Sequence, residues 1–231
     1  MDTLALKADL AAAFRLADHF GFSEGICNHF SVMTDDARFI LNRHGIHWSR
    51  LTQSDMLVVD PASPPEGVEI TALNIHGAIH AAHPAATCVL HTHMPYATAL
   101  TCLDDPRLRP LHQNACRFYD DIAYDHDYNG LADTRQEGER LARCMGSKRV
   151  LFMANHGVIV VGPTIASAFD NLYYLERACQ FQVLAMSTGQ HLREISGNVA
   201  ATTKHQFDTE DDYAEAHFKA LKTLLEPDYL N

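Results

Sequence analysis

Apolar residues recur at three- and four-residue spacing along several stretches of the chain, which is the pattern of a helix with one buried face. Leu6, Leu10 and Phe14 follow this spacing in the first stretch, and Gly21 lies just past its end. Thr164 is placed to cap the longest helix, because its hydroxyl can accept a hydrogen bond from a free N–H of the first turn. The predicted helices span residues 4–20, 71–83, 95–103, 133–146, 164–188 and 210–225.

Shorter apolar or alternating segments lie between these helices and are typical of strands. The stretch 104–130 is rich in loop residues and carries only short elements, around 114–118 and 122–124. Because helices and strands mix along the chain with no dividing boundary, we expect one domain over 1–231, a sheet flanked by helices of α/β or α+β class. The predicted strands are the end of the 25–33 segment, 38–42, 56–59, 87–93, 150–153 and 158–161.

Composition narrows the class of protein. Hydrophobic residues make up 47% of the 231 residues, which is enough for a sizeable core. The formal net charge of -11 argues against nucleic-acid binding, which depends on Lys and Arg neutralising phosphates. No apolar run reaches the roughly 20 residues of a membrane helix, and the chain opens with no signal-peptide pattern. Without such a run we expect no membrane partner. The six cysteines form no CxxC pair, and a chain this long with a real core needs no disulfide framework, so we expect reduced thiols and a cytoplasmic location.

The sequence contains 15 histidines, and three of them predict a metal site. His91 and His93 lie two residues apart on a predicted strand, so their side chains point to the same face. His156 lies in a tight turn between two predicted strands and is the best candidate for a third ligand. Three protein ligands with an open position are typical of catalytic zinc, and Mn²⁺, Fe²⁺ and Co²⁺ also accept imidazole.

A second group of histidines competes with this prediction. His76, His80 and His83 lie at i, i+4 and i+7 on the predicted helix over 71–83, and the i, i+4 spacing is also one of metal ligands. However, Ile75 and Ile79 define a neighbouring apolar stripe, so the histidines can equally be the polar flank of that helix.

Glu176 interrupts an apolar helical stripe formed by Phe169, Leu172, Cys179 and Val183. A buried carboxylate needs a partner. One interpretation is catalytic: Glu176 accepts the N–H of a ligand imidazole, or carries a proton with a raised pKa. The other is structural, in which the carboxylate pairs with a buried arginine or with helix N–H groups. The sequence supports both equally.

Two motifs give the chain a resemblance to a known family. They are the run Cys88-Val-Leu-His91-Thr-His93 and, about sixty residues later, the turn Asn155-His156-Gly157. Together they resemble the class II aldolase/adducin superfamily over about residues 5–190. The resemblance implies a three-layer α/β/α sandwich around a largely antiparallel sheet, and a homo-tetramer with active sites between subunits. It also implies that His91, His93 and His156 hold a divalent metal, usually zinc.

The resemblance assigns further residues to a substrate site. Asn28 and Gly45 match part of the phosphate site of the family's aldolases, and Arg43 is a candidate partner for an acidic substrate group. His29 is either a further substrate contact or a plain loop residue. The aldolases have a proton-transferring glutamate at the position of Ala72. Since this chain lacks that glutamate, it resembles the adducin-like branch of the family more closely.

These features favour a metal-dependent lyase that acts on a small oxygenated carbonyl or carboxylate compound through a metal-stabilised enolate, by aldol cleavage or decarboxylation. Decarboxylation is a natural variant here, because loss of CO2 forms the enolate without a base such as the missing glutamate at Ala72. The alternative is a non-catalytic, adducin-like binding or assembly module in which the metal is structural or absent.

Overall fold

The computed structural model of the chain describes residues 2–83, 86–210 and 212–231. Its strands form a seven-stranded sheet in the order β3-β2-β1-β4-β7-β6-β5, and every neighbouring pair is antiparallel except β5 and β6. The largely antiparallel sheet predicted from the family resemblance is therefore confirmed. The strands are β1 (His29–Met33), β2 (Phe39–Asn42), β3 (Met56–Val59), β4 (Cys88–Thr92), β5 (Ile122–Asp125), β6 (Val150–Met153) and β7 (Gly157–Gly162).

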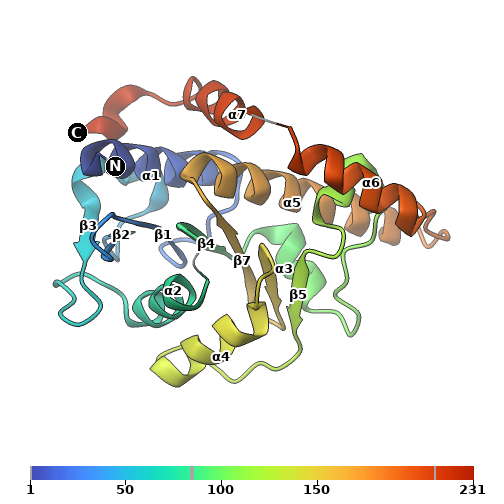
Figure 1. Cartoon of the computed structure of the whole chain (residues 1–231), viewed down its shortest axis with the longest axis horizontal. Helices are drawn as coiled ribbons and strands as arrows, with labels where there is room; N and C mark the ends of the chain where they lie inside the picture. The colour runs from blue at the N-terminus through green and yellow to red at the C-terminus, as the bar shows by residue number, and fades with distance from the viewer. Residues whose placement is uncertain (1, 84–85, 211) are drawn as a thin grey trace.

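Helices cover both faces of this sheet, which gives the expected three layers (Figure 1). Helices α1 and α5 pack on one face, α2 and α4 pack on the other, and α6 and α7 run outside the first layer. The helices are α1 (Thr3–His19), α2 (Ile70–Ala82), α3 (Pro95–Thr101), α4 (Arg135–Met145), α5 (Ile165–Ser187), α6 (Gly197–Asp208) and α7 (Tyr213–Lys222).

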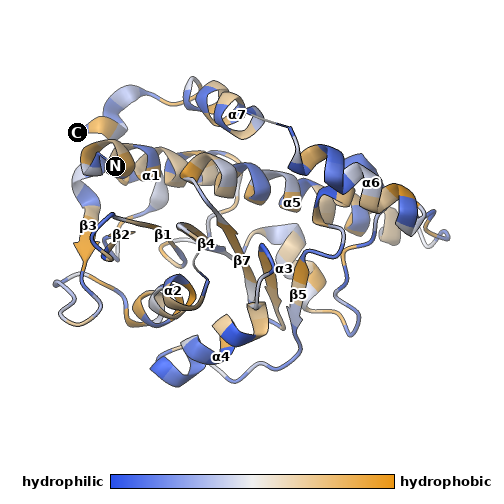
Figure 2. Cartoon of the chain, in the orientation of Figure 1, coloured by the Kyte–Doolittle hydropathy of each residue, from blue (hydrophilic) through white to orange (hydrophobic). Residues whose placement is uncertain are grey.

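Alternation along the strands divides the core into two parts. Phe30 and Leu90 belong to the core beneath α1 and α5, whereas Val89 and Ile159 belong to the core beneath α2 and α4. Figure 2 shows the matching pattern, with hydrophobic residues along β7 and hydrophilic residues over much of α4. Because side chains two apart share a face, His91 lies on the α2 side of the sheet together with Val89.

The predicted elements agree with the structure except near the C-terminus. Helix α6 was not predicted, and the last helix is shorter than the predicted 210–225. Only Ala200 of α6 is buried, so its sequence carries no apolar stripe that could have revealed it. Among the described residues, no helix combines the length and apolar character needed to cross a bilayer.

Candidate metal centre

His91 and His93 reach the site from β4 and from the residues that follow it. His91 is paired with His29 of β1 and with Ile159 of β7, so it lies in the middle of the sheet and is only 2% exposed. His93 comes directly after the strand ends, where the chain turns towards α3. The spacing of two residues therefore places both rings on one side of β4, as the alternation predicts.

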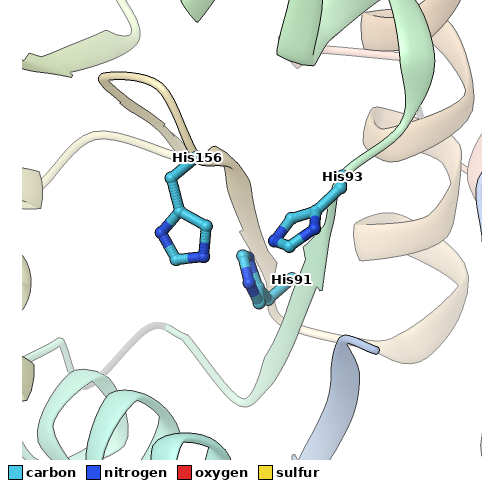
Figure 3. Close-up of side chains that lie close together, drawn as sticks. All are labelled: His91, His93 and His156. Carbon is cyan, nitrogen blue, oxygen red and sulfur yellow. The ribbon is translucent and has the colours of Figure 1, made fainter. Parts of the chain in front are cut away.

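His156 comes from the turn that joins β6 to β7. Asn155 adopts a left-handed backbone (φ 55°), and its N–H bonds to the carbonyl of Thr101, which anchors the turn. Figure 3 shows the three rings facing one another at the end of the sheet. One nitrogen from each ring lies within 4.8 Å of the others, and this is the one group of potential ligands of three or more that the described ranges contain.

Hydrogen bonds orient two of the rings as metal ligands. His91 donates its Nδ1–H to the carbonyl of Val158 at 3.0 Å, and His93 donates its Nδ1–H to the carboxylate of Glu24 at 2.5 Å. Both rings then keep Nε2 unprotonated. Nε2 of His93 is buried without a hydrogen-bond partner in the described structure, which is the state expected of a ligand atom awaiting a cation. The imidazole nitrogens of these three histidines therefore suit a divalent metal such as zinc as ligands.

Burial also keeps the rings of His91 and His156 uncharged. Burial, reinforced by the neighbouring imidazoles of His156 and His29, holds the pKa of His91 well below its usual value. Burial and the nearby His93 lower the pKa of His156 to about 4. Neutral imidazole is the form that binds metal, so the site does not need to release protons from these two rings before binding near pH 7.

The three histidines line a cleft with two lobes. The Tyr128 lobe has a volume of about 380 Å³ and the Glu69 lobe about 220 Å³, and both include the triad, Thr71 and Leu131. The Tyr128 lobe is otherwise lined by Glu24, Ile75, Thr98, Tyr128, Gly130, Ala132 and Asn155. The wall of the Glu69 lobe further includes Asn28, His29, Asn42, His44, Glu69 and Ala72.

Of Asn28, Arg43 and Gly45, the residues assigned to the substrate site, Asn28 is the one that the structure brings to the triad. The further candidate His29 lies on β1 and lines the Glu69 lobe. The backbone of Asn28 is left-handed (φ 74°), and its Oδ1 accepts the N–H of His93 at 3.1 Å. Its Nδ2 lies 3.4 Å from Nε2 of His91. Asn28 thus links the loop before β1 to both His91 and His93. Substrate binding by its amide stays a prediction.

Arg43 and Gly45 do not line the cleft, although His44 between them does. Arg43 is exposed, and its guanidinium lies beside Gly67, where an added Cβ would be 2.9 Å from Nη1. Gly45 takes a left-handed turn (φ 89°). The two residues shape the loop that carries His44, which is the side chain of this loop that faces the cleft.

Glu176 has the partners expected from its structural interpretation. Its two carboxylate oxygens accept the N–H groups of Tyr96 and Ala97 at 2.8 and 2.9 Å, so it caps the start of α3. Burial raises the pKa of this carboxyl, against the effect of these hydrogen bonds. The carboxylate is therefore engaged with the helix that follows His93, and it does not line either lobe of the cleft.

The competing stripe on α2 does not form a metal site. His76 and His80 turn to the sheet and hydrogen-bond to Ser31, and His76 also bonds to His29. Glu24, by contrast, was not predicted. It lies 69 positions before its partner His93 in an irregular loop, and nothing in the local sequence marks it as a partner of His93.

Comparisons with known proteins agree with this geometry. The family model described as Class II Aldolase and Adducin N-terminal domain matches residues 8–183. A solved structure of an aldolase II superfamily protein from Pseudomonas syringae is 32% identical, has a TM-score of 0.90, and aligns over 99% of this chain and 96% of that chain.

Two further relatives differ in kind. The solved L-fuculose 1-phosphate aldolase from Glaciozyma antarctica is 26% identical, with a TM-score of 0.86 over 99% of this chain and 92% of that one. Alpha-adducin of Mus musculus is 33% identical over 193 residues, which is 79% of this chain but 26% of adducin. The chain thus resembles both an enzyme and the first part of a longer protein.

Proposed function

The chain belongs to the class II aldolase and adducin family, and on that premise we propose that it is a metal-dependent lyase acting on a small oxygenated carbonyl or carboxylate compound. The proposed reaction is aldol cleavage or decarboxylation. The proposal depends on one observation: Nε2 of His93 is buried without a partner, in a group of three imidazole nitrogens that lie within 4.8 Å of one another.

His91, His93 and His156 would hold the metal, with zinc as the first choice and Mn²⁺, Fe²⁺ or Co²⁺ as alternatives. A bound divalent cation supplies a Lewis acid that polarises a substrate carbonyl. Around it, the carbonyl of Val158 and the carboxylate of Glu24 hold two of the rings in their ligand tautomer. The cleft lobes on either side offer room for a small substrate.

The side chain at position 72 favours cleavage without proton removal from carbon. Ala72 lines the Glu69 lobe and is 1% exposed, so no carboxylate projects from this turn of α2. Glu69, the nearest acidic residue, is engaged in hydrogen bonds to Thr71 and Ala72. For Glu176, we propose a positioning role, because its carboxylate fixes the start of α3 behind His93.

We also propose that the protein is a homo-oligomer, a tetramer by analogy with the family. Ile26 and Leu131 support this, because both line the Glu69 lobe of the cleft and have 43% and 74% of their surface exposed. Apolar side chains grouped in this way are typical of a surface that another subunit covers. All six cysteines are free thiols, which suits a reducing compartment such as the cytoplasm.

A non-catalytic, adducin-like module is the second candidate. It is supported by the likeness to alpha-adducin and by Ala72, which removes a carboxylate from the cleft. In this alternative the chain would bind a partner protein, and any bound metal would have only a structural role.

Metal content and carbonyl chemistry test the first proposal together. Purified protein is expected to hold about one zinc per chain and to release an aldehyde or CO2 from some member of a panel of small hydroxycarbonyl and keto-acid compounds. The double substitution His91→Ala, His93→Ala should abolish both. A matched control replaces two exposed histidines, His191→Ala and His205→Ala, and should change neither. If the protein takes up no divalent ion, or if the His91→Ala, His93→Ala variant keeps full turnover, the lyase proposal fails.

A further inference from the structure

A chain of buried hydrogen bonds leads from the sheet to the Glu69 lobe. His80 contacts the carbonyl of Ala86 through Nδ1 at 2.9 Å, and its Nε2 lies 2.7 Å from the hydroxyl of Ser31. That hydroxyl contacts Nδ1 of His76, whose Nε2 lies 2.7 Å from Nδ1 of His29. Ser31 and His76 are fully buried, and His29 is 6% exposed.

The carbonyl of Ala86 fixes the direction of every hydrogen bond in this chain. A carbonyl only accepts, so His80 must carry its proton on Nδ1 and accept at Nε2 from the hydroxyl of Ser31. Ser31 then accepts from Nδ1–H of His76, and Nε2 of His76 accepts from Nδ1–H of His29. A neutral imidazole has one N–H, so Nε2 of His29 is left with a free lone pair.

The free lone pair of His29 faces another acceptor. Nε2 of His29 lies 3.9 Å from Oε2 of Glu69, and both residues line the Glu69 lobe. At 3.9 Å the two atoms are too far apart for a hydrogen bond, as expected of two acceptors that face each other. The amide oxygen of Asn42 in the same wall is also buried, with no partner among the described residues. His29, Asn42 and Glu69 thus each present to the lobe an acceptor atom that carries no hydrogen.

Glu69 also fills the place where an anion would bind. The N-terminus of a helix attracts phosphate through its free N–H groups, and α2 begins at this lobe. Here Oε2 of Glu69 already accepts the N–H of Ala72 at 2.8 Å and the hydroxyl of Thr71 at 2.5 Å. Although burial opposes it, these hydrogen bonds lower the pKa of Glu69, so the carboxylate is ionised. Among the described residues, no Lys or Arg lines the lobe.

We propose that the Glu69 lobe binds the uncharged, hydroxyl-bearing end of the substrate and excludes a phosphate, with Nε2 of His29 accepting a hydrogen bond from the substrate hydroxyl. His29 is then a specificity-determining residue, and Ser31 and His76 are positioning residues that set its tautomer. This inference rests on the proposed metal site, beside which the lobe lies. The lobe therefore differs in charge from one suited to a sugar phosphate, although a structural relative is an L-fuculose 1-phosphate aldolase.

Three hydroxamates test the inference, because they share a metal-chelating group and differ only in their tails. Acetohydroxamate has a methyl tail, glycolohydroxamate a hydroxyl tail and phosphoglycolohydroxamate a phosphate tail. For the zinc-loaded chain, calorimetry should find glycolohydroxamate bound about 3- to 10-fold more tightly than acetohydroxamate, the effect of one hydrogen bond. The phosphate tail should bind at least about 10-fold more weakly than the hydroxyl tail, because of the resident carboxylate.

Two substitutions separate the parts of the argument. Glu69→Gln keeps an acceptor for Thr71 and Ala72 but removes the negative charge. It should therefore reduce the difference in affinity between glycolohydroxamate and phosphoglycolohydroxamate. Ser31→Ala removes the acceptor of Nδ1–H of His76, which allows His76 to carry its proton on Nε2 and to donate it to His29. His29 then presents an N–H to the lobe. The affinity for glycolohydroxamate should therefore fall, and the affinity for phosphoglycolohydroxamate should rise.

The tautomer of His29 can also be measured directly, without a ligand. Nitrogen-15 shifts of the imidazole should report an unprotonated Nε2 in the wild-type protein and a protonated one in Ser31→Ala. A protonated Nε2 in the wild-type chain would overturn the inference, as would equal or tighter binding of the phosphate tail.

The three probes also distinguish this failure from that of the proposed function. Zinc-loaded protein that does not bind acetohydroxamate lacks an open metal position, so the proposed function fails. Protein that binds acetohydroxamate but gains nothing from the hydroxyl tail retains the metal site and refutes the hydroxyl assignment alone. Tighter binding of glycine hydroxamate, with an ammonium tail, than of glycolohydroxamate would also refute it.

Discussion

The ring of His93 packs against the backbone of Gly157. A Cβ added at Gly157 would lie 2.7 Å from Cδ2 of His93 and 2.5 Å from the carbonyl oxygen of Thr92. Both distances are too short for a carbon atom, so a side chain at position 157 would push the ring or the strand aside. The glycine after His156 thus keeps a second ligand, His93, in place.

Gly157→Ala is therefore expected to weaken zinc binding by about 10- to 100-fold, the usual effect of disturbing the support of a ligand. Overpacking should also cost about 1–3 kcal/mol of unfolding free energy. Competition with a coloured chelator measures the zinc affinity, and urea unfolding measures the unfolding free energy. Gly77→Ala is the matched control, because a Cβ there meets nothing within 4 Å and the helix should gain about 1 kcal/mol. Zinc affinity unchanged in Gly157→Ala would contradict the assignment of His93.

Glu24→Ala tests the partner of His93. Without the carboxylate, Nδ1–H of His93 loses its acceptor, and the ring is free to rotate or to change tautomer. We expect zinc affinity to fall by about 10-fold, at the low end of such effects, since the side chain of Glu24 is 64% exposed and water can replace it. The exposed Glu66→Ala is the control for the loss of one acidic residue. Equal zinc affinities in the two variants would show that Glu24 does not orient the ligand.

Glu176→Gln separates a positioning role from a catalytic one. The amide of Gln would place an NH2 group opposite one of the two backbone N–H donors of α3, so about 1–3 kcal/mol of stability should be lost. Metal content is expected to stay near the wild-type value. Thermal unfolding and metal analysis measure the two quantities. Glu139→Gln is the control, because the side chain of Glu139 is 43% exposed and its ion pair with Arg135 lies at the surface. A loss of turnover at unchanged stability would instead support the catalytic interpretation.

His80 predicts how stability changes with pH. Burial, opposed by the hydrogen bond to Ala86, lowers its pKa from 6.5 to about 4. Between these values the unfolded chain binds a proton that the folded chain does not, so stability falls as pH falls from 6.5 to 4. Each such histidine contributes a slope of up to about 1.4 kcal/mol per pH unit.

Urea unfolding at several pH values measures this slope, and His80→Gln should reduce it. Gln offers an N–H and an oxygen to the same two partners, so the variant is the conservative replacement. A slope that is identical in the two proteins would mean that His80 does not titrate differently on folding.

Much of the site followed from local sequence, and the reason is geometric. A separation of two residues on a strand places His91 and His93 on one face whatever surrounds them. A histidine between two short apolar runs, before a glycine, must lie in a turn at the end of a sheet, which is where His156 lies. A sheet flanked by helices followed in the same way, because helical and strand periodicity are properties of the chain itself, whereas the three layers were expected from the family resemblance.

Tertiary structure alone decided what each of these side chains faces. The sequence left Glu176 with two interpretations, since a buried carboxylate on a helix does not reveal whether a ring or a backbone N–H lies opposite. The sequence made Arg43 a candidate for substrate binding, but in the structure its neighbour His44 lines the cleft. The partners of His29, His76 and Glu24 lie 45 to 69 positions away, so the direction of each hydrogen bond exists only once the sheet brings them together. Spacing fixes which face a side chain takes, whereas its contacts depend on distant segments that no local pattern encodes.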